Sequence, residues 1–150
     1  MKRISTLGLN VFSDSLDRIS LKGSSAQTLN TISPNSYGLA TKDAVFKQSL
    51  MESDYLVLDG VYFAFTSILL KGENIKRNQG PEIFNYFVNK MDIMNGRVFF
   101  LGSSQETLDK IRKKLKFEYG GITAEFMSPP FKREFFGQDN ALMIDEINKF

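Results

Sequence analysis

The sequence of 150 residues contains no cysteine, no histidine and no tryptophan. Without cysteine, the chain forms no disulfide and offers no thiol nucleophile. Without histidine as well, it lacks the ligands of the usual zinc sites and the general base of Ser-His and Cys-His mechanisms. These absences exclude the usual zinc proteins and the triad-type enzymes.

Long hydrophobic runs are absent too. The longest run, residues 61–70, has about half of the ~20 residues that a helix needs to cross a bilayer. Two positive charges follow Met1, but no apolar segment comes after them, so the N-terminus does not read as a secretory signal. We expect a cytoplasmic protein, able to work peripherally at the inner face of the cell membrane.

Phosphate-binding and metal-binding motifs are also missing. The chain has no G-x-x-x-x-G-K-[ST] loop and no G-x-G-x-x-G fingerprint. It also lacks the D-x-D pair with which many sugar-nucleotide enzymes hold a divalent metal on the diphosphate. We therefore expect no metal site and no cofactor.

The residues that are present indicate a folded α/β protein. A hydrophobic fraction of 42% with 14 phenylalanines excludes a disordered chain, and the length predicts a single domain over residues 1–150. The net charge of +2 is too small to indicate a nucleic-acid partner. A basic run from Lys110 to Lys116 could bind nucleic acid or anionic lipid, but we favour a solvated helix face.

The most informative stretch is an apolar run that ends in a carboxylate. Tyr55 to Leu58 is continuous and apolar, which predicts a strand buried on both faces, and Asp59-Gly60 follows at once. Ligands of open parallel sheets bind just beyond the carboxyl ends of the strands, so Asp59 is a functional candidate. Capping of a following helix is the alternative role, and position alone leaves both open.

The rest of the pattern alternates strands with helices. It predicts an α/β fold with a Rossmann-like parallel sheet, flanking helices and a small N-terminal hairpin. In chain order we expect a hairpin within 4–22, a strand at 27–32, a helix from Pro34 to near Ser53 with Ser33 as N-cap, a strand at 55–59, a helix to Leu70, a polar loop at 73–79, a helix at 81–94, a strand at 97–102, a helix with Ser103 and Glu106 as its capping box, a strand at 122–127 and a helix at 140–150 capped by Asp139.

Three polar residues lie at strand ends or just beyond them. Thr31 and Asp59 fall at the carboxyl ends of two strands, which meet at one edge of a parallel sheet. Arg77, in the polar loop, could neutralise an anion bound there, although a surface arginine is the commoner case. The sequence therefore predicts a cleft containing Thr31 and Asp59.

The same residues resemble a known family, the WecG/TagA/CpsF glycosyltransferases, also called glycosyltransferase family 26. The resemblance covers residues 29–133 and rests on the order and spacing of several short motifs. In chain order they are Thr31, Ser33-Pro34-Asn35, Ala40-Thr41-Lys42-Asp43, Asp59-Gly60, Arg77-Asn78-Gln79-Gly80-Pro81-Glu82, Val98-Phe99-Phe100-Leu101-Gly102 and Pro129-Pro130-Phe131.

The resemblance implies a metal-independent, inverting transferase. Such an enzyme moves a hexose, often N-acetylmannosamine, from a UDP-sugar to a polyprenyl-diphosphate-linked sugar during cell-wall or surface-polysaccharide assembly. By motif, Asp59 matches the general base that deprotonates the acceptor hydroxyl. The predicted substrate contacts are Thr31, Asn35, Gly60, Arg77 and Gly102.

This chain departs from the family pattern in two places. Val61-Tyr62 stands where the family has a second small residue after Asp-Gly, which predicts a narrower pocket floor. Family members also continue well past position 150, so we expect the domain to be incomplete at its C-terminus. A truncated, non-catalytic remnant or partner-binding module of the same fold is therefore the main alternative, and an unpaired strand edge would favour homo-oligomers.

Two further interpretations carry less weight. A receiver-like signalling domain fits the length and the strand-end aspartate, but Thr31-Ile32-Ser33 lacks the acidic pair that such a site needs. The phenylalanine-rich segment 126–136 could touch lipid or the acceptor, but packing in the core is the interpretation that we favour.

Overall fold

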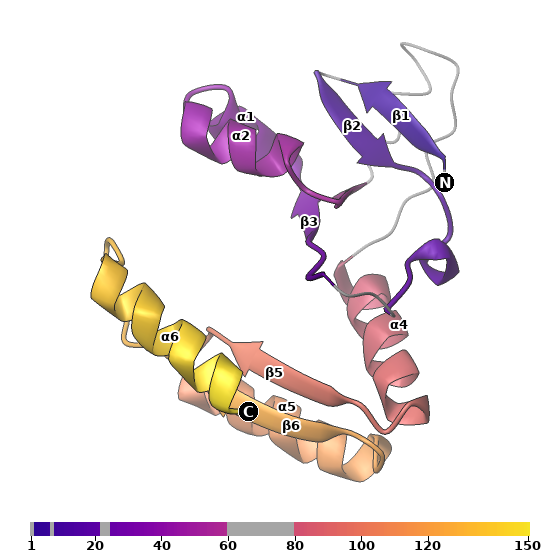
Figure 1. Ribbon diagram of the computed structural model, residues 1–150, viewed down its shortest axis with the longest axis vertical. Coiled ribbons are helices and arrows are strands. Elements are labelled where there is room, and N and C mark those ends of the chain that lie inside the picture. The colour runs from indigo at the N-terminus through magenta and orange to yellow at the C-terminus, as the bar shows by residue number, and fades with distance from the viewer. Residues whose placement is uncertain (1, 7, 22–24, 60–79) are drawn as a thin grey trace. The chain divides into compact units, whose positions relative to one another are not determined.

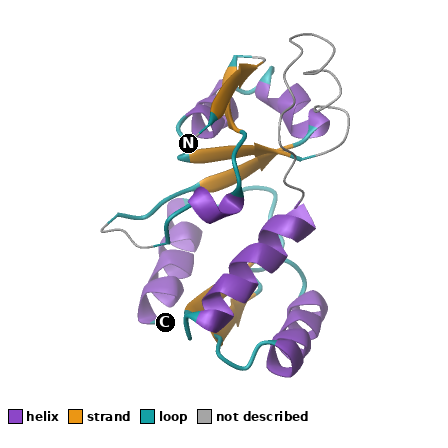
Figure 2. Cartoon of the chain, turned by 90° about the vertical axis from the view of Figure 1, so that its right-hand side faces the viewer, coloured by secondary structure: helices purple, strands orange, loops and turns teal. Residues whose placement is uncertain are grey.

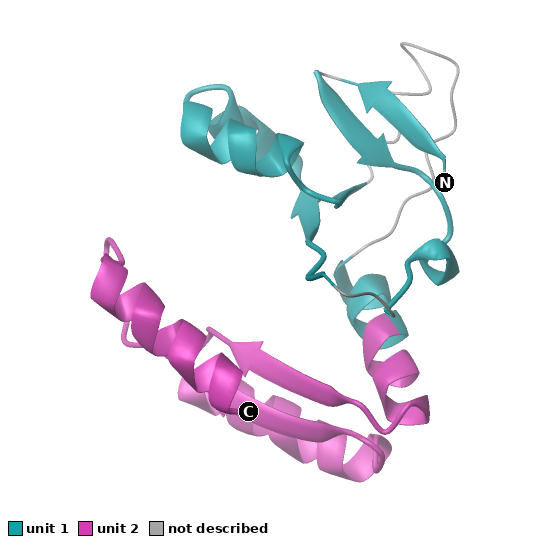
Figure 3. Cartoon of the chain, viewed as in Figure 1, with its two compact units in different colours: residues 1–86 teal, residues 87–150 magenta. Residues whose placement is uncertain are grey.

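The computed structural model describes residues 2–6, 8–21, 25–59 and 80–150. The chain divides into two compact units, residues 1–86 and 87–150 (Figure 3). The single domain predicted over residues 1–150 stays a prediction. The predicted helix to Leu70 and the polar loop at 73–79 lie outside the described residues.

The first unit begins with the predicted hairpin. Strands β1 (Arg3–Thr6) and β2 (Leu9–Phe12) pair antiparallel (Figure 1). Gly8 lies in the turn between them with a φ of +74°, a conformation that glycine adopts at no steric cost. A short 3-10 helix, η1 (Leu16–Arg18), follows the hairpin.

A parallel strand pair forms the centre of the first unit. Strands β3 (Leu29–Ile32) and β4 (Tyr55–Leu58) are parallel, with Ile32 opposite Leu58. All four residues of β4 are buried, which confirms the prediction of a strand enclosed on both faces. β2 packs against β4, where the rings of Phe12 and Tyr55 meet edge to face at 5.4 Å. The core of the unit is the cluster Ile4, Leu9, Val11, Ile32, Ala40, Leu50, Leu56 and Leu58.

The single helix predicted from Pro34 to Ser53 is wrong, because the chain forms two. Helix α1 (Pro34–Ala40) ends at Thr41, and α2 (Ala44–Met51) begins after Asp43. The Asp43 carboxylate accepts a hydrogen bond from the Phe46 N–H at 2.9 Å, as an N-cap does. An aspartate therefore starts a new helix where the apolar pattern suggested a continuous one. The predicted cap of α1, Ser33, is confirmed.

A threonine and an aspartate form hydrogen bonds with each other at the amino ends of β3 and β4. The Thr28 N–H and hydroxyl donate to Asp54 Oδ2 at 2.8 and 3.1 Å, and the Asp54 N–H donates back to Thr28 Oγ1 at 3.1 Å. These bonds, the one from the Thr28 amide above all, lower the pKa of Asp54. They fix the register of the two strands at their amino ends.

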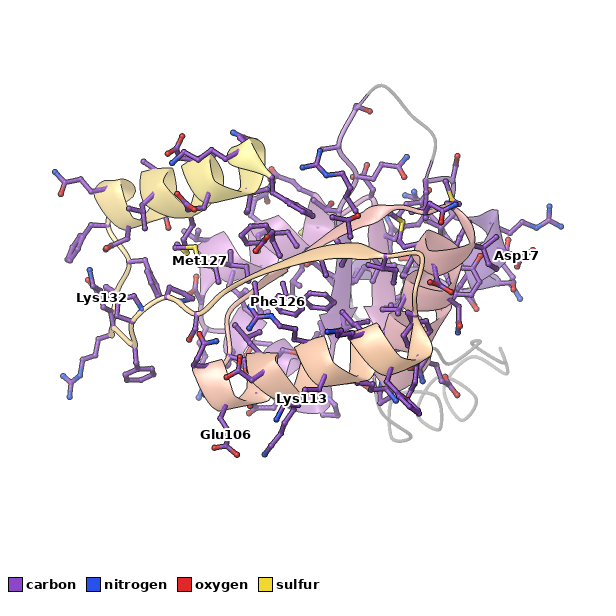
Figure 4. The ribbon with its side chains drawn as sticks, turned by 90° about the horizontal axis from the view of Figure 1, so that it is seen from below. Asp17, Glu106, Lys113, Phe126, Met127 and Lys132 are labelled. Carbon is purple, nitrogen blue, oxygen red and sulfur yellow. The ribbon has the colours of Figure 1, made fainter. Side chains whose placement is uncertain are left out.

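The second unit is a parallel strand pair between two helices. It begins within helix α4 (Gly80–Ile93) and contains strands β5 (Arg97–Leu101) and β6 (Thr123–Met127), which are parallel. Helices α5 (Gln105–Glu118) and α6 (Gly137–Lys149) lie on opposite faces of this pair (Figures 1 and 4). On the α5 face, the rings of Phe100 and Phe126 stack at 5.0 Å, and the Arg112 guanidinium lies 4.5 Å from the Phe126 ring centre.

Helix α4 ends in a Schellman motif at the predicted place. The Gly96 N–H donates to the Met91 carbonyl at 2.8 Å, and the Asn95 N–H donates to the Asp92 carbonyl at 3.1 Å. Asn95 takes the left-handed conformation, with a φ of +48°. The turn between α5 and β6 packs on this end of α4, since the Gly121 N–H donates to Asp92 Oδ1 at 2.7 Å.

Two predicted caps in the second unit are wrong. The N-cap of α5 is Ser104, whose hydroxyl accepts from the Thr107 N–H, and not Ser103. Ser103 has a φ of +66° and its carbonyl accepts from the Ser128 hydroxyl at 2.7 Å, so it belongs to the preceding turn. Asp139 is the third residue of α6, where its carboxylate accepts from the Phe136 N–H at 3.0 Å.

The basic run on α5 is paired along the helix. Lys110, Arg112 and Lys114 form ion pairs with Glu106, Asp109 and Glu118, and all six side chains are largely solvent-exposed. Lys113 and Glu106 point away from β6 (Figure 4). Ion pairs of this kind contribute little to stability. This pairing favours the interpretation of a solvated helix face.

The class predicted from the sequence is confirmed. The described chain is α/β and Rossmann-like, with helices between the strands of each parallel pair and an antiparallel hairpin at the N-terminus (Figure 2).

We expect acid to weaken the first unit through Asp54. The folded-state pKa of Asp54 lies below its unfolded value of about 4, so this carboxylate stabilises the fold above that pH and ceases to do so as pH falls through the folded pKa. Asp54→Asn should therefore unfold at a lower denaturant concentration than the wild-type chain at pH 7. On acidification to pH 3, its midpoint denaturant concentration should fall by less than that of the wild-type chain. Thr28→Val, which removes the hydroxyl donor, should behave similarly. Parallel pH profiles for all three chains would contradict this.

We expect Gly121→Ala to destabilise the second unit. A Cβ at this position would collide with the backbone carbonyl oxygen of Asp92. Overpacking of this kind costs about 1–3 kcal/mol, measurable by chemical denaturation. Gly120→Ala is the matched control, because its Cβ would meet no atom within 4 Å. Equal losses in the two variants would show that the contact with α4 is not the cause.

Candidate active site

The carboxyl edge of the β3–β4 pair carries Asp59. Its backbone N–H donates to the Ile32 carbonyl at 2.9 Å, so the ladder continues one residue beyond β4. The side chain is half-buried. The carboxylate that the sequence singled out therefore follows a fully enclosed strand, with its backbone held by the neighbouring strand.

Thr31 belongs to the same edge. It lies one residue before the end of β3, opposite Val57, and it is exposed. Asp59 directly follows β4, the strand that pairs with β3, so both residues lie at the carboxyl edge of this pair. The structure thus brings the backbones of these two residues to one edge of the pair, and the cleft predicted to contain them stays a prediction.

Helix α1 starts at this edge as well. Ser33 directly follows β3 and caps α1, and Pro34 fills the first helical position. Asn35 is the second residue of the helix and is exposed. The predicted base Asp59 and the predicted substrate contacts Thr31 and Asn35 therefore all lie at the end of one strand pair. Gly60 and Arg77 lie outside the described residues.

Gly102 lies in the second unit, at the corresponding strand end. It follows β5 with a φ of +107°, and its N–H donates to the Met127 carbonyl at 2.9 Å. Gly102 lines a pocket of about 830 Å³. The turn before α5 lines one side of the pocket and the segment after β6 lines the other. The lining residues are Gly102, Ser103, Ser104, Gln105, Ser128, Pro129, Pro130, Phe131, Lys132, Phe135 and Met143.

The character of this pocket differs between its sides. Two serines and a glutamine come from the α5 turn, whereas the segment after β6 supplies prolines and phenylalanines together with a serine and a lysine. The pocket suits a ligand with a polar part and a flat apolar part. Sequence reasoning missed the pocket because it assigned segment 126–136 to the core. That prediction is wrong for Phe131, which is 99% exposed, and Phe136 is 67% exposed. The signal was the proline pair, which ends β6 and turns the chain outward.

Within residues 2–6, 8–21, 25–59 and 80–150, no cluster of three or more acidic side chains is arranged to hold a metal ion. Among the helices in these ranges, none is long and apolar enough to cross a bilayer.

The chain matches a known protein family over nearly its whole length. The glycosyl transferase WecG/TagA/CpsF family matches residues 2–150. The chain belongs to the WecG/TagA/CpsF glycosyltransferase family. No curated protein matches it.

Membership of the WecG/TagA/CpsF family confirms the resemblance drawn from residues 29–133. It establishes the general kind of protein, a glycosyltransferase family of polysaccharide biosynthesis that acts on a sugar donor and an acceptor. The individual site residues stay predictions.

In this WecG/TagA/CpsF chain we expect Gly102→Ala to be destabilising. The added methyl group meets no atom within 4 Å, so the cost comes from the backbone conformation alone. A side chain at such a φ costs about 1–3 kcal/mol. Chemical denaturation measures this loss, with Gly120→Ala again as the control. A stability equal to that of the wild-type chain would contradict the geometry of the turn.

Proposed function

We propose that this chain transfers a hexose, such as N-acetylmannosamine, from a UDP-sugar to a polyprenyl-diphosphate-linked sugar. The reaction belongs to cell-wall or surface-polysaccharide assembly and proceeds with inversion, without a metal or cofactor. The observation that carries this proposal is the position of Asp59 beside Thr31 at the carboxyl edge of the buried β3–β4 pair, in a chain of this family.

Asp59 is the general base of the proposed reaction. Its carboxylate accepts the proton of the acceptor hydroxyl as the hydroxyl oxygen attacks the anomeric carbon of the donor sugar. The bond from that carbon to the UDP oxygen breaks, and UDP leaves with the electron pair. A single displacement inverts the anomeric centre. The fixed Asp59 backbone supports this role, because a base must be held within hydrogen-bond reach of its proton.

The other predicted residues bind the substrates. Thr31 and Asn35 are exposed at the carboxyl edge of the β3–β4 pair and offer a hydroxyl and an amide to sugar hydroxyls. Gly60 and Arg77 keep the roles that the family motif implies, with Arg77 neutralising the donor diphosphate. Gly102 keeps the substrate contact that the family motif implies, and in the second unit it lines the pocket of about 830 Å³, whose polar and apolar residues suit part of a nucleotide sugar.

The proposed cellular location follows from the chemistry of the acceptor. A polyprenyl chain stays in a membrane, so the proposed location is the cytoplasm, peripherally at the inner face of the cell membrane. Self-association into a homo-oligomer stays a prediction.

Asp59→Asn is expected to abolish most turnover and to preserve the fold. Asparagine keeps the shape of the side chain but cannot take up the acceptor proton at neutral pH. We expect a fall of about 10²- to 10⁴-fold in the rate of UDP release and of product formation. The assay uses the full chain, UDP-N-acetylmannosamine and a lipid-linked sugar, with product identified by mass spectrometry and folding checked by circular dichroism.

Asp43→Asn is the matched control. Asp43 caps α2, and asparagine caps a helix about as well as aspartate, so this variant should keep both fold and turnover. If Asp59 acted only as a cap, both substitutions would be silent in the assay. Undiminished transfer by Asp59→Asn refutes the base assignment. A folded wild-type chain that transfers no sugar favours the non-catalytic alternative.

A further inference from the structure

One peptide group at the carboxyl edge of β3 makes hydrogen bonds on both sides. The carbonyl of Ile32 accepts from the Asp59 N–H at 2.9 Å. The N–H of Ser33, in the same peptide group, donates to Ser36 Oγ at 2.7 Å. A peptide group is planar and stiff, so fixing its N–H also fixes the direction of its carbonyl. The Ser36 hydroxyl is thus connected to the Asp59 backbone through a single rigid unit.

The Ser36 hydroxyl is itself held in place. It donates to the Ser33 carbonyl at 3.0 Å and lies 3.1 Å from Ser33 Oγ. The Ser36 N–H donates to Ser33 Oγ at 3.2 Å, and both serines are half-buried. In a capping box the third helical residue is usually glutamate or glutamine. A serine here reaches the same N–H with a shorter side chain that has fewer conformations.

This bond is the reciprocal half of the capping box, and it also affects the strand that precedes α1. The Ser33 hydroxyl alone satisfies the Ser36 N–H of α1. The bond from the Ser33 N–H to Ser36 Oγ acts instead on the strand side of the cap, where the Ile32 carbonyl holds the last amide of the ladder. Hydrogen bonds in series polarise one another, so this bond also strengthens the one from Asp59.

We propose that Ser36 is a positioning residue for Asp59, acting through the Ile32–Ser33 peptide group. This inference rests on the proposed function only in naming Asp59 as the base. The Ser36 hydroxyl holds the backbone from which the Asp59 carboxylate projects, and so sets where that carboxylate meets the acceptor hydroxyl.

The test is amide hydrogen exchange of the full chain, followed residue by residue by NMR. Loss of one neutral hydrogen bond corresponds to about a three- to tenfold change in an equilibrium. Ser36→Ala should therefore speed exchange of the Asp59 amide by about that factor, beyond any change in global stability. Ser36→Thr, which keeps the hydroxyl, should restore the wild-type rate. Ser36→Cys, a weaker acceptor, should lie between them.

Two control variants separate positioning from general loosening of the fold. Ser33→Ala removes the acceptor of the Ser36 N–H and one contact of the Ser36 hydroxyl, but it leaves the Ser33 N–H bond, so exchange should rise much more at Ser36 than at Asp59. Ser49→Ala removes a hydroxyl that donates to the Phe46 carbonyl at 2.8 Å on α2, and should leave Asp59 unchanged. The proposal is overturned if the exchange rate of the Asp59 amide in Ser36→Ala changes only as much as global stability does. It is also overturned if Ser33→Ala speeds exchange of the Asp59 amide as much as Ser36→Ala does.

A kinetic comparison completes the experiment. In a chain that transfers sugar, Ser36→Ala should lower kcat and leave the KM for the donor unchanged, because a displaced base affects the chemical step. If Ser36→Ala lowers the stability of the fold but leaves kcat unchanged, the proposal is overturned. A wild-type chain without transferase activity refutes the proposed function but leaves the exchange result at Asp59 to decide the positioning role.

Discussion

The parallel pairing of β3 with β4 is the constraint on which the first unit depends. β4 is wholly apolar and wholly enclosed, so its backbone groups must find partners in the neighbouring strand. That requirement fixes the register with Ile32 opposite Leu58 and extends the ladder to Asp59. The threonine–aspartate tie at the amino end and the serine cap at the carboxyl end close the two ends of this ladder.

Much of this arrangement was predictable from the sequence, because the relevant signals are local. A continuous apolar run and a Ser-Pro helix start each have one dominant structural meaning, whereas position alone leaves a strand-end carboxylate with two, a functional group or a helix cap. Together they predicted the parallel pair, the cap at Ser33 and the shared edge of Thr31 and Asp59. The family resemblance added the general chemistry that residue patterns alone do not provide.

The errors arose where two local solutions compete. Asp43 fits both an exposed helix position and a cap, and its bond to the Phe46 N–H decides for the cap. Ser103 and Ser104 both suit the start of α5, and the Ser128 hydroxyl, distant in sequence, takes the Ser103 carbonyl into the turn. The hydroxyl of Ser36 was overlooked because serine is not the usual residue at that position of a capping box.

The pocket beside Gly102 carries a consequence for recognition. Phe131 is almost fully exposed, and it follows two prolines whose backbone φ angles are fixed by their rings. The prolines reduce the backbone freedom that this segment loses when a ligand covers the ring. The entropic cost that remains is that of ordering the exposed Phe131 side chain, and the apolar contact between ring and ligand offsets it.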